Sequence, residues 1–267
     1  MKYDEDPLSF SLYPTFREGV LPTGNASYSL YPSAFNLQPS TFNLLDRPSP
    51  LIPIMTDAQT QELIRAVEQA DSPARLVAAV QNLVAAQDEA GISTLIAVLG
   101  YNNPTAAVAA VQGLIELGGA AVQPLMEQLD EYNYGARAYA IRALAALADT
   151  RALDLLSASA ATDFAPSVRR AAAKGLGSLH WSHLDGEERS LAQVKATETL
   201  LAVAQDSDWS IRYAAVVGLQ ALATTPDLKQ QIGAQFEQIA QTDPDIAVRA
   251  RVNLAQQLLS PYIKTGQ

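Results

Sequence analysis

Cysteine is absent from this chain of 267 residues, and only two histidines are present. A disulfide, a thiolate metal site and a cysteine nucleophile are therefore excluded on this chain. The histidines, His180 and His183, are three residues apart, and the sequence places no third ligand beside them. We therefore expect no metal site.

Positive charge is also scarce. The chain has 18 Lys and Arg against 28 Asp and Glu, which gives a formal net charge of −10. An acidic surface repels phosphate backbones, so nucleic acid is not an expected partner. The sequence has no run of 18 apolar residues and no basic start followed by an apolar core. We expect a cytoplasmic protein with no membrane span.

Residues 1–54 differ in composition from the rest, because eight of the 15 prolines fall there. The sequence Ser-Leu-Tyr-Pro at 11–14 recurs at 29–32. Proline removes an amide donor and disfavours helical conformation in the residue before it, so no long helix is expected. Three interpretations stay open: sequence upstream of a natural start at Met55, a docking tail, or a disordered leader. In each case we expect folding of the remainder to be independent of this segment.

From residue 55 onward the sequence is rich in Ala and Leu and repeats itself. Four similar segments align at Arg137, Arg169, Arg212 and Arg249, at intervals of 32, 43 and 37 residues. Each follows an amphipathic run with apolar residues at the helical spacing of three and four, after a turn that contains Asn, Asp, Gly or Pro. The repeating unit is therefore a pair of helices, which can bury its apolar face only by stacking on its neighbours.

This pattern predicts an all-α fold, a HEAT-like helical-repeat solenoid (an α–α superhelix) over residues 55–267. Small residues at the expected helix crossings, Gly218 among them, would permit close packing. The long interval before Arg212 reflects an insertion at 180–189. We expect a cap pair at 59–87 and five repeats, at about 90–118, 120–148, 151–179, 191–223 and 228–259.

Three tracts are more specific than a generic repeat: EYNYGARAYAIRAL at 131–144, DFAPSVRRAA at 163–172 and DWSIRYAAVVGL at 208–219. They resemble the E/F-type phycobilin lyase family, and most nearly the F-type subunits of the lyases that act on the phycocyanin α subunit. The resemblance covers about residues 57–258. It implies a heterodimer with an E-type partner that attaches phycocyanobilin to a cysteine of the phycocyanin α subunit as a thioether. The related lyase-isomerases have an F-type subunit with adjacent His and Cys, which a chain without cysteine cannot supply.

The nucleophile of that reaction would be the acceptor's thiol, so the lyase would hold the pigment, neutralise its two propionates and position the thiol. Arg and aromatic side chains suit these tasks, and in HEAT-like units the second helix lines the concave face. The expected bilin- or substrate-binding residues are Tyr132, Tyr134, Arg137, Trp209, Arg212 and Tyr213. No catalytic residue is identified. Ordinary HEAT architecture also explains the two arginines, through bonds to neighbouring turns, and core packing also explains Trp209 and Tyr213.

Trp181 lies in the insertion, where it could contact a partner or cap the solenoid. No Gly-rich phosphate loop, Ser-His-Asp set or carboxylate dyad emerges from the spacing. We expect no permanently bound cofactor, with phycocyanobilin as a substrate. An alternative function is a non-catalytic scaffold or chaperone that binds phycobiliproteins, including a role in phycobilisome assembly or degradation.

Overall fold

The structure is a computed structural model that describes residues 57–128 and 133–259. The chain divides into two units, Met1–Ile52 and Pro53–Gln267, and all the described residues belong to the second. Within these ranges there are twelve α-helices and three short 3-10 helices, and no strand. The predicted all-α class is confirmed, whereas the interpretations of residues 1–54 lie outside the described residues.

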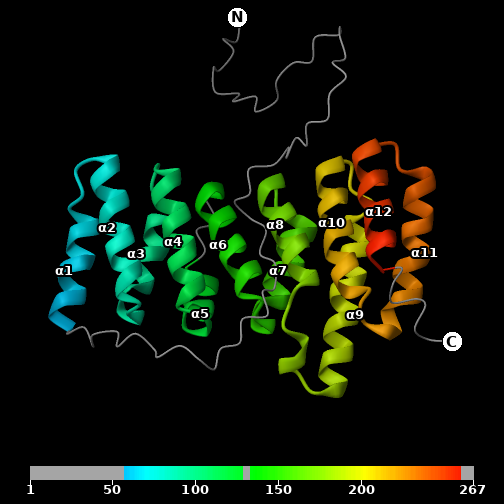
Figure 1. Cartoon of the computed structure of the whole chain (residues 1–267), viewed down its shortest axis with the longest axis horizontal. Coiled ribbons are helices and arrows are strands. Elements are labelled where there is room, and N and C mark those ends of the chain that lie inside the picture. The colour runs from blue at the N-terminus through cyan, green and yellow to red at the C-terminus, as the bar shows by residue number, and fades with distance from the viewer. Residues whose placement is uncertain (1–56, 129–132, 260–267) are drawn as a thin grey trace, which may run out of the picture. The chain divides into compact units, whose positions relative to one another are not determined.

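The helices follow one another with short turns between them, as Figure 1 shows. In chain order they are α1 (Asp57–Glu68), α2 (Pro73–Ala86), α3 (Ile92–Val98), α4 (Pro104–Glu116), α5 (Gly119–Glu127), α6 (Tyr134–Leu147), α7 (Leu153–Thr162), α8 (Pro166–Gly177), α9 (Gly186–Val203), α10 (Trp209–Leu222), α11 (Pro226–Thr242) and α12 (Ile246–Leu259). The 3-10 helices are η1 (Glu89–Gly91), η2 (Thr150–Ala152) and η3 (Trp181–His183). None of these described helices is long and apolar enough to cross a membrane.

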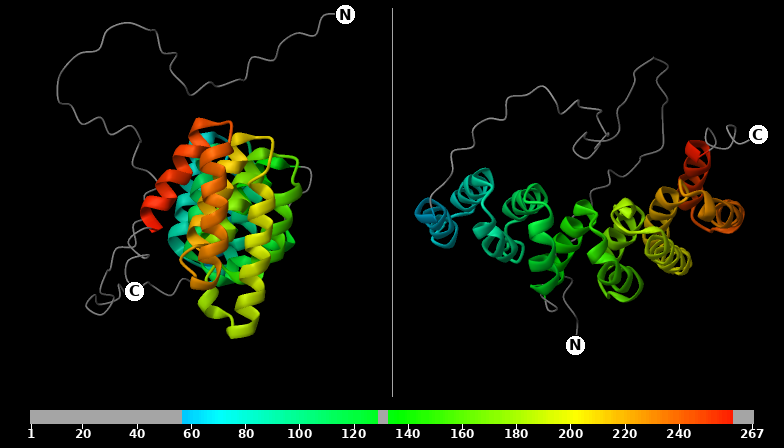
Figure 2. Two further views of the ribbon diagram at one scale, coloured as in Figure 1. Left: turned by 90° about the vertical axis from the view of Figure 1, so that its right-hand side faces the viewer. Right: turned by 90° about the horizontal axis from the view of Figure 1, so that it is seen from below.

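The helices of this unit form two layers. The even-numbered helices from α2 to α12 lie side by side, each in contact with the next even-numbered helix. The odd-numbered helices lie behind them, with α3 against α5 and α9 against both α7 and α11. Figure 2 shows the two layers when the unit is viewed from below. This is the stacked arrangement that the repeat predicts, because each helix pair covers the apolar face of the next.

Side-chain caps mark the start of several even-numbered helices, α4, α6 and α10 among them. Asn103, Asn133 and Asp208 each precede a helix, and each accepts a hydrogen bond from a backbone N–H of its first turn, at 3.1, 3.0 and 2.8 Å. Such caps satisfy donors that a helix leaves free at its start. The amide of Asn103 also donates to the carbonyl of Pro73, so this cap joins two successive repeats.

The core is built mostly from Ala and Leu, and its tightest crossing joins α8 to α10. A Cβ added at Gly177 would lie 2.1 Å from the carbonyl oxygen of Gly218, and one at Gly218 would lie 2.4 Å from that of Ala173. Only hydrogen fits in such a space. The role expected for Gly218 is therefore confirmed, and the even-numbered layer is held in close register at its centre.

Candidate functional site

Three ion pairs, which we call the ladder, join successive repeats and account for three of the four repeated arginines. In each, an arginine near the start of an even-numbered helix reaches an aspartate in the turn after the next odd-numbered helix: Arg137–Asp163, Arg169–Asp206 and Arg212–Asp243. Arg137 donates from Nε and Nη2 at 2.7 and 3.1 Å, and Arg212 donates from the same atoms at 2.8 Å each. Bidentate pairs of this kind fix geometry strongly.

These pairs are also largely buried. The side chains of Arg212 and Asp243 are 10% and 5% exposed, and those of Arg137 and Asp163 are 10% exposed each. The guanidinium of Arg212 lowers the pKa of Asp243 below its ordinary value, mainly through the hydrogen bonds between them. A bilin contact by Arg137 or Arg212 stays a prediction, and the observed bonds are those of the architectural alternative. The case for a bilin-binding site therefore rests more on the other predicted residues than on these two arginines.

Two predicted aromatic residues are exposed at the start of their helices. Tyr134 opens α6 and is 62% exposed, and Trp209 opens α10 and is 44% exposed. Large aromatic side chains exposed at equivalent positions two repeats apart are not needed by the core, so they are available for binding. Tyr213 is half-buried against the core, with the guanidinium carbon of Arg251 6.0 Å from its ring centroid. Tyr132 lies outside the described residues.

The insertion carries Trp181 in η3, half-buried against the core. The neighbouring rings of His180 and His183 lie 5.3 Å apart, centroid to centroid. Across residues 57–128 and 133–259, no group of three or more potential metal ligands occurs. The partner contact predicted for Trp181 stays a prediction, and its packing fits the capping alternative.

Four cations that the sequence analysis did not single out gather on the even-numbered layer. We call them the basic patch: Arg142 on α6, Arg170 and Lys174 on α8, and Arg251 on α12. The charges of all three arginines act on Lys174, and together with the loss of hydration around it, which is the larger cause, they lower its pKa. None of the four forms an ion pair within the described part of the chain.

Polar and aromatic groups surround the basic patch. Arg170 donates from Nη1 to the hydroxyl of Ser210 at 3.0 Å, and Asp208 accepts from that hydroxyl at 2.7 Å. Arg142 lies over the ring of Tyr139, with its guanidinium carbon 5.6 Å from the centroid. These contacts place the patch beside Trp209, which follows Asp208 at the start of α10.

Arg251 is held by a neighbouring helix and is partly buried. It donates from Nη2 to the side-chain oxygen of Gln220, while its buried Nη1 has no hydrogen-bond partner among the described residues. Burial is the first cause of a pKa below the ordinary arginine value. A guanidinium with a free, dehydrated N–H favours an anionic acceptor.

One signal for the patch was present in the sequence. Arg142 and Lys174 each lie five residues after a ladder arginine, Arg137 or Arg169, and so occupy the same position in adjacent repeats. The stacking of the even-numbered helices brings equivalent positions together. Arg251 comes from a different repeat position, and only the fold brings it near the others.

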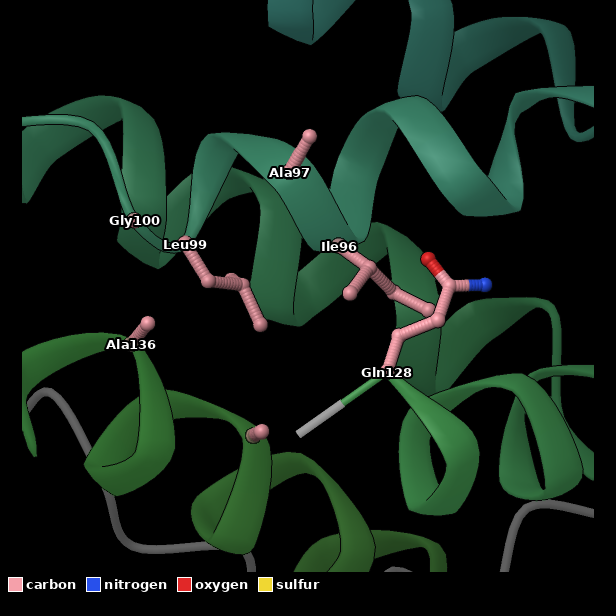
Figure 3. Close-up of a pocket in the computed structure, with 7 residues that line it drawn as sticks. Ile96, Ala97, Leu99, Gly100, Gln128 and Ala136 are labelled. Atoms are coloured by element: carbon pink, nitrogen blue, oxygen red, sulfur yellow. The ribbon is translucent and has the colours of Figure 1, made fainter. Parts of the chain in front are cut away.

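A small hollow lies between α3 and the start of α6, shown in Figure 3. Its volume is about 170 Å³, and it is lined by Ile96, Ala97, Leu99, Gly100, Gln128, Ala136 and Ala140. Pockets that enclose drug-sized ligands are usually about 300–1,000 Å³. A four-ring pigment therefore does not fit inside this hollow.

Comparison with known proteins gives the class to which this arrangement belongs. The family of HEAT repeats matches residues 122–196. The phycocyanobilin lyase subunit beta of Nostoc sp. PCC 7120 is 59% identical over 197 residues, which are 74% of this chain and 98% of that protein. The phycocyanin alpha phycocyanobilin lyase CpcF of Synechocystis sp. PCC 6803 is 47% identical over 195 residues, which are 73% of this chain and 91% of that protein.

A solved structure agrees with these relatives. The complex of CpcE and CpcF of phycocyanin lyase from Nostoc sp. PCC 7120 contains a chain 60% identical to this one, with a TM-score of 0.62 over 63% of this chain and 99% of that chain. The described unit is thus a HEAT-repeat subunit of the bilin lyase class. The chain belongs to the family of phycocyanobilin lyase beta subunits, and the resemblance seen in the sequence is confirmed.

Proposed function

We propose that this chain is the F-type subunit of a heterodimeric lyase that attaches phycocyanobilin to a cysteine of the phycocyanin α subunit. The observation that carries the proposal is the 59% identity to a phycocyanobilin lyase subunit beta over nearly all of that protein. The 60% identity to a chain of a CpcE–CpcF complex supports an E-type partner.

The reaction fits a chain without cysteine. The acceptor's thiol adds across the ethylidene double bond of ring A, so that sulfur bonds to one carbon and the thiol proton goes to the other. Atoms and electrons balance without an oxidant or a second nucleophile. The protein has to hold the extended pigment beside the thiol, which accelerates the addition through proximity and orientation. The exposed rings of Tyr134 and Trp209 offer flat surfaces for pyrrole rings.

The C-terminal end of the described unit supports a heterodimer. On the last described helix, α12, Leu254 and Leu258 are 47% and 51% exposed. They are four residues apart and so share one helix face. An apolar face at the end of a solenoid needs a cap or a partner to cover it. We infer that α12 and the first helix pair, α1 and α2, contribute to the contact with the E-type subunit.

Co-expression tests the proposed function. The chain is produced with its E-type partner, apo phycocyanin α subunit and phycocyanobilin, and covalent pigment is measured by zinc-induced fluorescence of the denatured acceptor. We expect an adduct only when both subunits are present. Samples lacking one subunit, the pigment or the acceptor cysteine are the controls. An intact heterodimer that binds the acceptor and never forms an adduct would leave the scaffold function instead.

A further inference from the structure

The basic patch differs from the ladder because its cations form no ion pair within the described residues, although Arg170 and Arg251 each donate a hydrogen bond to α10. We propose that Arg142, Arg170, Lys174 and Arg251 form the site that binds the two propionates of the linear tetrapyrrole. This inference rests on the proposed function and deepens it, because it assigns a ligand group to residues outside the predicted site.

The first argument is the charge of the patch. The chain carries ten more acidic than basic side chains, and yet four cations gather on one layer without an ion pair among the described residues. The hydrogen bond from Ser210 is the main cause of the lowered pKa of Asp208, and the nearby charge of Arg170 adds to it, but Asp208 forms no ion pair with Arg170. Like charges gathered on a partly exposed surface destabilise one another until an anion joins them.

The second argument is the number of anionic groups that the patch can hold. Arg142 and Lys174 come from α6 and α8, whereas Arg251 comes from α12, on the other side of α10. Because the cations come from three helices, α6, α8 and α12, they suit a ligand with two carboxylates better than a ligand with one. Arginine binds a carboxylate through two parallel hydrogen bonds, and three of the four cations of the patch are arginines.

The third argument is the presence of aromatic rings within the patch. Tyr139 lies beside Arg142, and Tyr213 lies beside Arg251. Aromatic rings next to cations favour a ligand that is flat and apolar as well as anionic. An acidic protein surface would satisfy the charges but would not require the rings. A tetrapyrrole with two propionates satisfies both.

The experiment compares phycocyanobilin with its dimethyl ester, which keeps the four rings and loses both negative charges. Dissociation constants are measured by absorbance with the complete heterodimer. The unsubstituted protein should bind the free acid at least about tenfold more tightly than the ester, because a charge-assisted hydrogen bond is worth about that factor. In the double variant Arg142→Gln/Lys174→Gln this preference should fall to about twofold or less, with ester affinity unchanged.

A matched variant controls for the loss of two charges. Arg151→Gln/Lys195→Gln removes two exposed cations that already pair with Asp149 and Asp154, away from the patch. It should keep the full preference for the free acid. Thermal melting of each variant shows whether it has folded.

Two results would overturn the inference. A folded patch variant that keeps the full preference would mean that the propionates bind elsewhere. A patch variant that keeps the preference but loses affinity for apo phycocyanin α subunit, or for the E-type subunit, would make the patch a protein-docking surface. In both cases adduct formation by the unsubstituted heterodimer would leave the proposed function standing. Absence of adduct from the unsubstituted heterodimer would contradict the proposed function itself.

Discussion

Gly177 on α8 and Gly218 on α10 lie with their backbones in direct contact, so that a methyl group on Gly177 would come within 2.1 Å of the Gly218 carbonyl oxygen. We predict that Gly218→Ala destabilises the protein by about 1–3 kcal/mol, because backbone atoms cannot move aside as a flexible side chain can. Urea unfolding measures the change. The control is Gly233→Ala on α11, where no atom lies within 4 Å of the added methyl. It should stabilise by up to about 1 kcal/mol, since alanine favours the helix. Equal effects at the two positions would contradict the close contact.

The ladder gives a second prediction. Arg212→Met should reduce the free energy of unfolding by about 3–5 kcal/mol, because it leaves Asp243 buried without its partner. Arg75→Met breaks a pair whose side chains are 71% and 67% exposed, and it should cost less than about 1 kcal/mol. Chemical denaturation of both variants checks the contrast. A loss below about 1 kcal/mol for Arg212→Met would show that the ladder does not stabilise the stack.

The ion pair between Arg212 and Asp243 predicts how the free energy of unfolding depends on pH. Arg212 lowers the pKa of Asp243 below the ordinary value of 3.8, so the folded state binds fewer protons than the unfolded state between the two pKa values. The contribution of the pair is therefore complete above pH 3.8 and is lost as the pH falls through the folded-state pKa. Unfolding free energies measured between pH 2 and pH 6 should fall below about pH 4. Asp243→Asn should be less stable at neutral pH and should show a shallower fall, whereas an unchanged slope would exclude this carboxyl as a cause.

The repeat pattern of the sequence was enough to predict the fold. It also indicated that the repeated arginines could bond to neighbouring turns, as they do in the ladder. The spacing of apolar residues reports which face of each helix is buried, and an arginine repeated in register reports a contact repeated between neighbours. The basic patch could not be predicted in the same way. Arg142 and Lys174 share a repeat position, but their proximity to Arg251 depends on how far the layer curves between α8 and α12. Exposure of Trp209 likewise depends on the packing of α10 and not on its own helix pattern.

The basic patch has a predicted cost in stability. Lys174 has a lowered pKa from loss of hydration and from the charges of Arg170, Arg142 and Arg251, so its charged form is disfavoured in the folded protein. Lys174→Gln should raise the melting temperature without pigment by about 0.5–2 °C, because repulsion between exposed like charges costs about 0.2–0.5 kcal/mol. Lys195→Gln removes an exposed lysine that pairs with Asp154, and should not raise it. A lower melting temperature for Lys174→Gln would mean that this lysine stabilises the fold.

Tyr134 and Trp209 should matter more for pigment attachment than for folding. Truncating a buried core aromatic to Ala costs about 3–5 kcal/mol, but these side chains are 62% and 44% exposed. We therefore expect Tyr134→Ala and Trp209→Ala to lose less than about 1 kcal/mol of stability, and to slow adduct formation by about tenfold, the loss expected when a stacking or hydrogen-bonding surface is removed. Melting and adduct formation are measured on the same samples of the heterodimer.

The control is Phe236→Ala, which removes a fully buried ring from α11 and should mainly reduce stability. If the two exposed variants lose stability in proportion to activity, as Phe236→Ala should, they are structural residues and the predicted binding face is wrong.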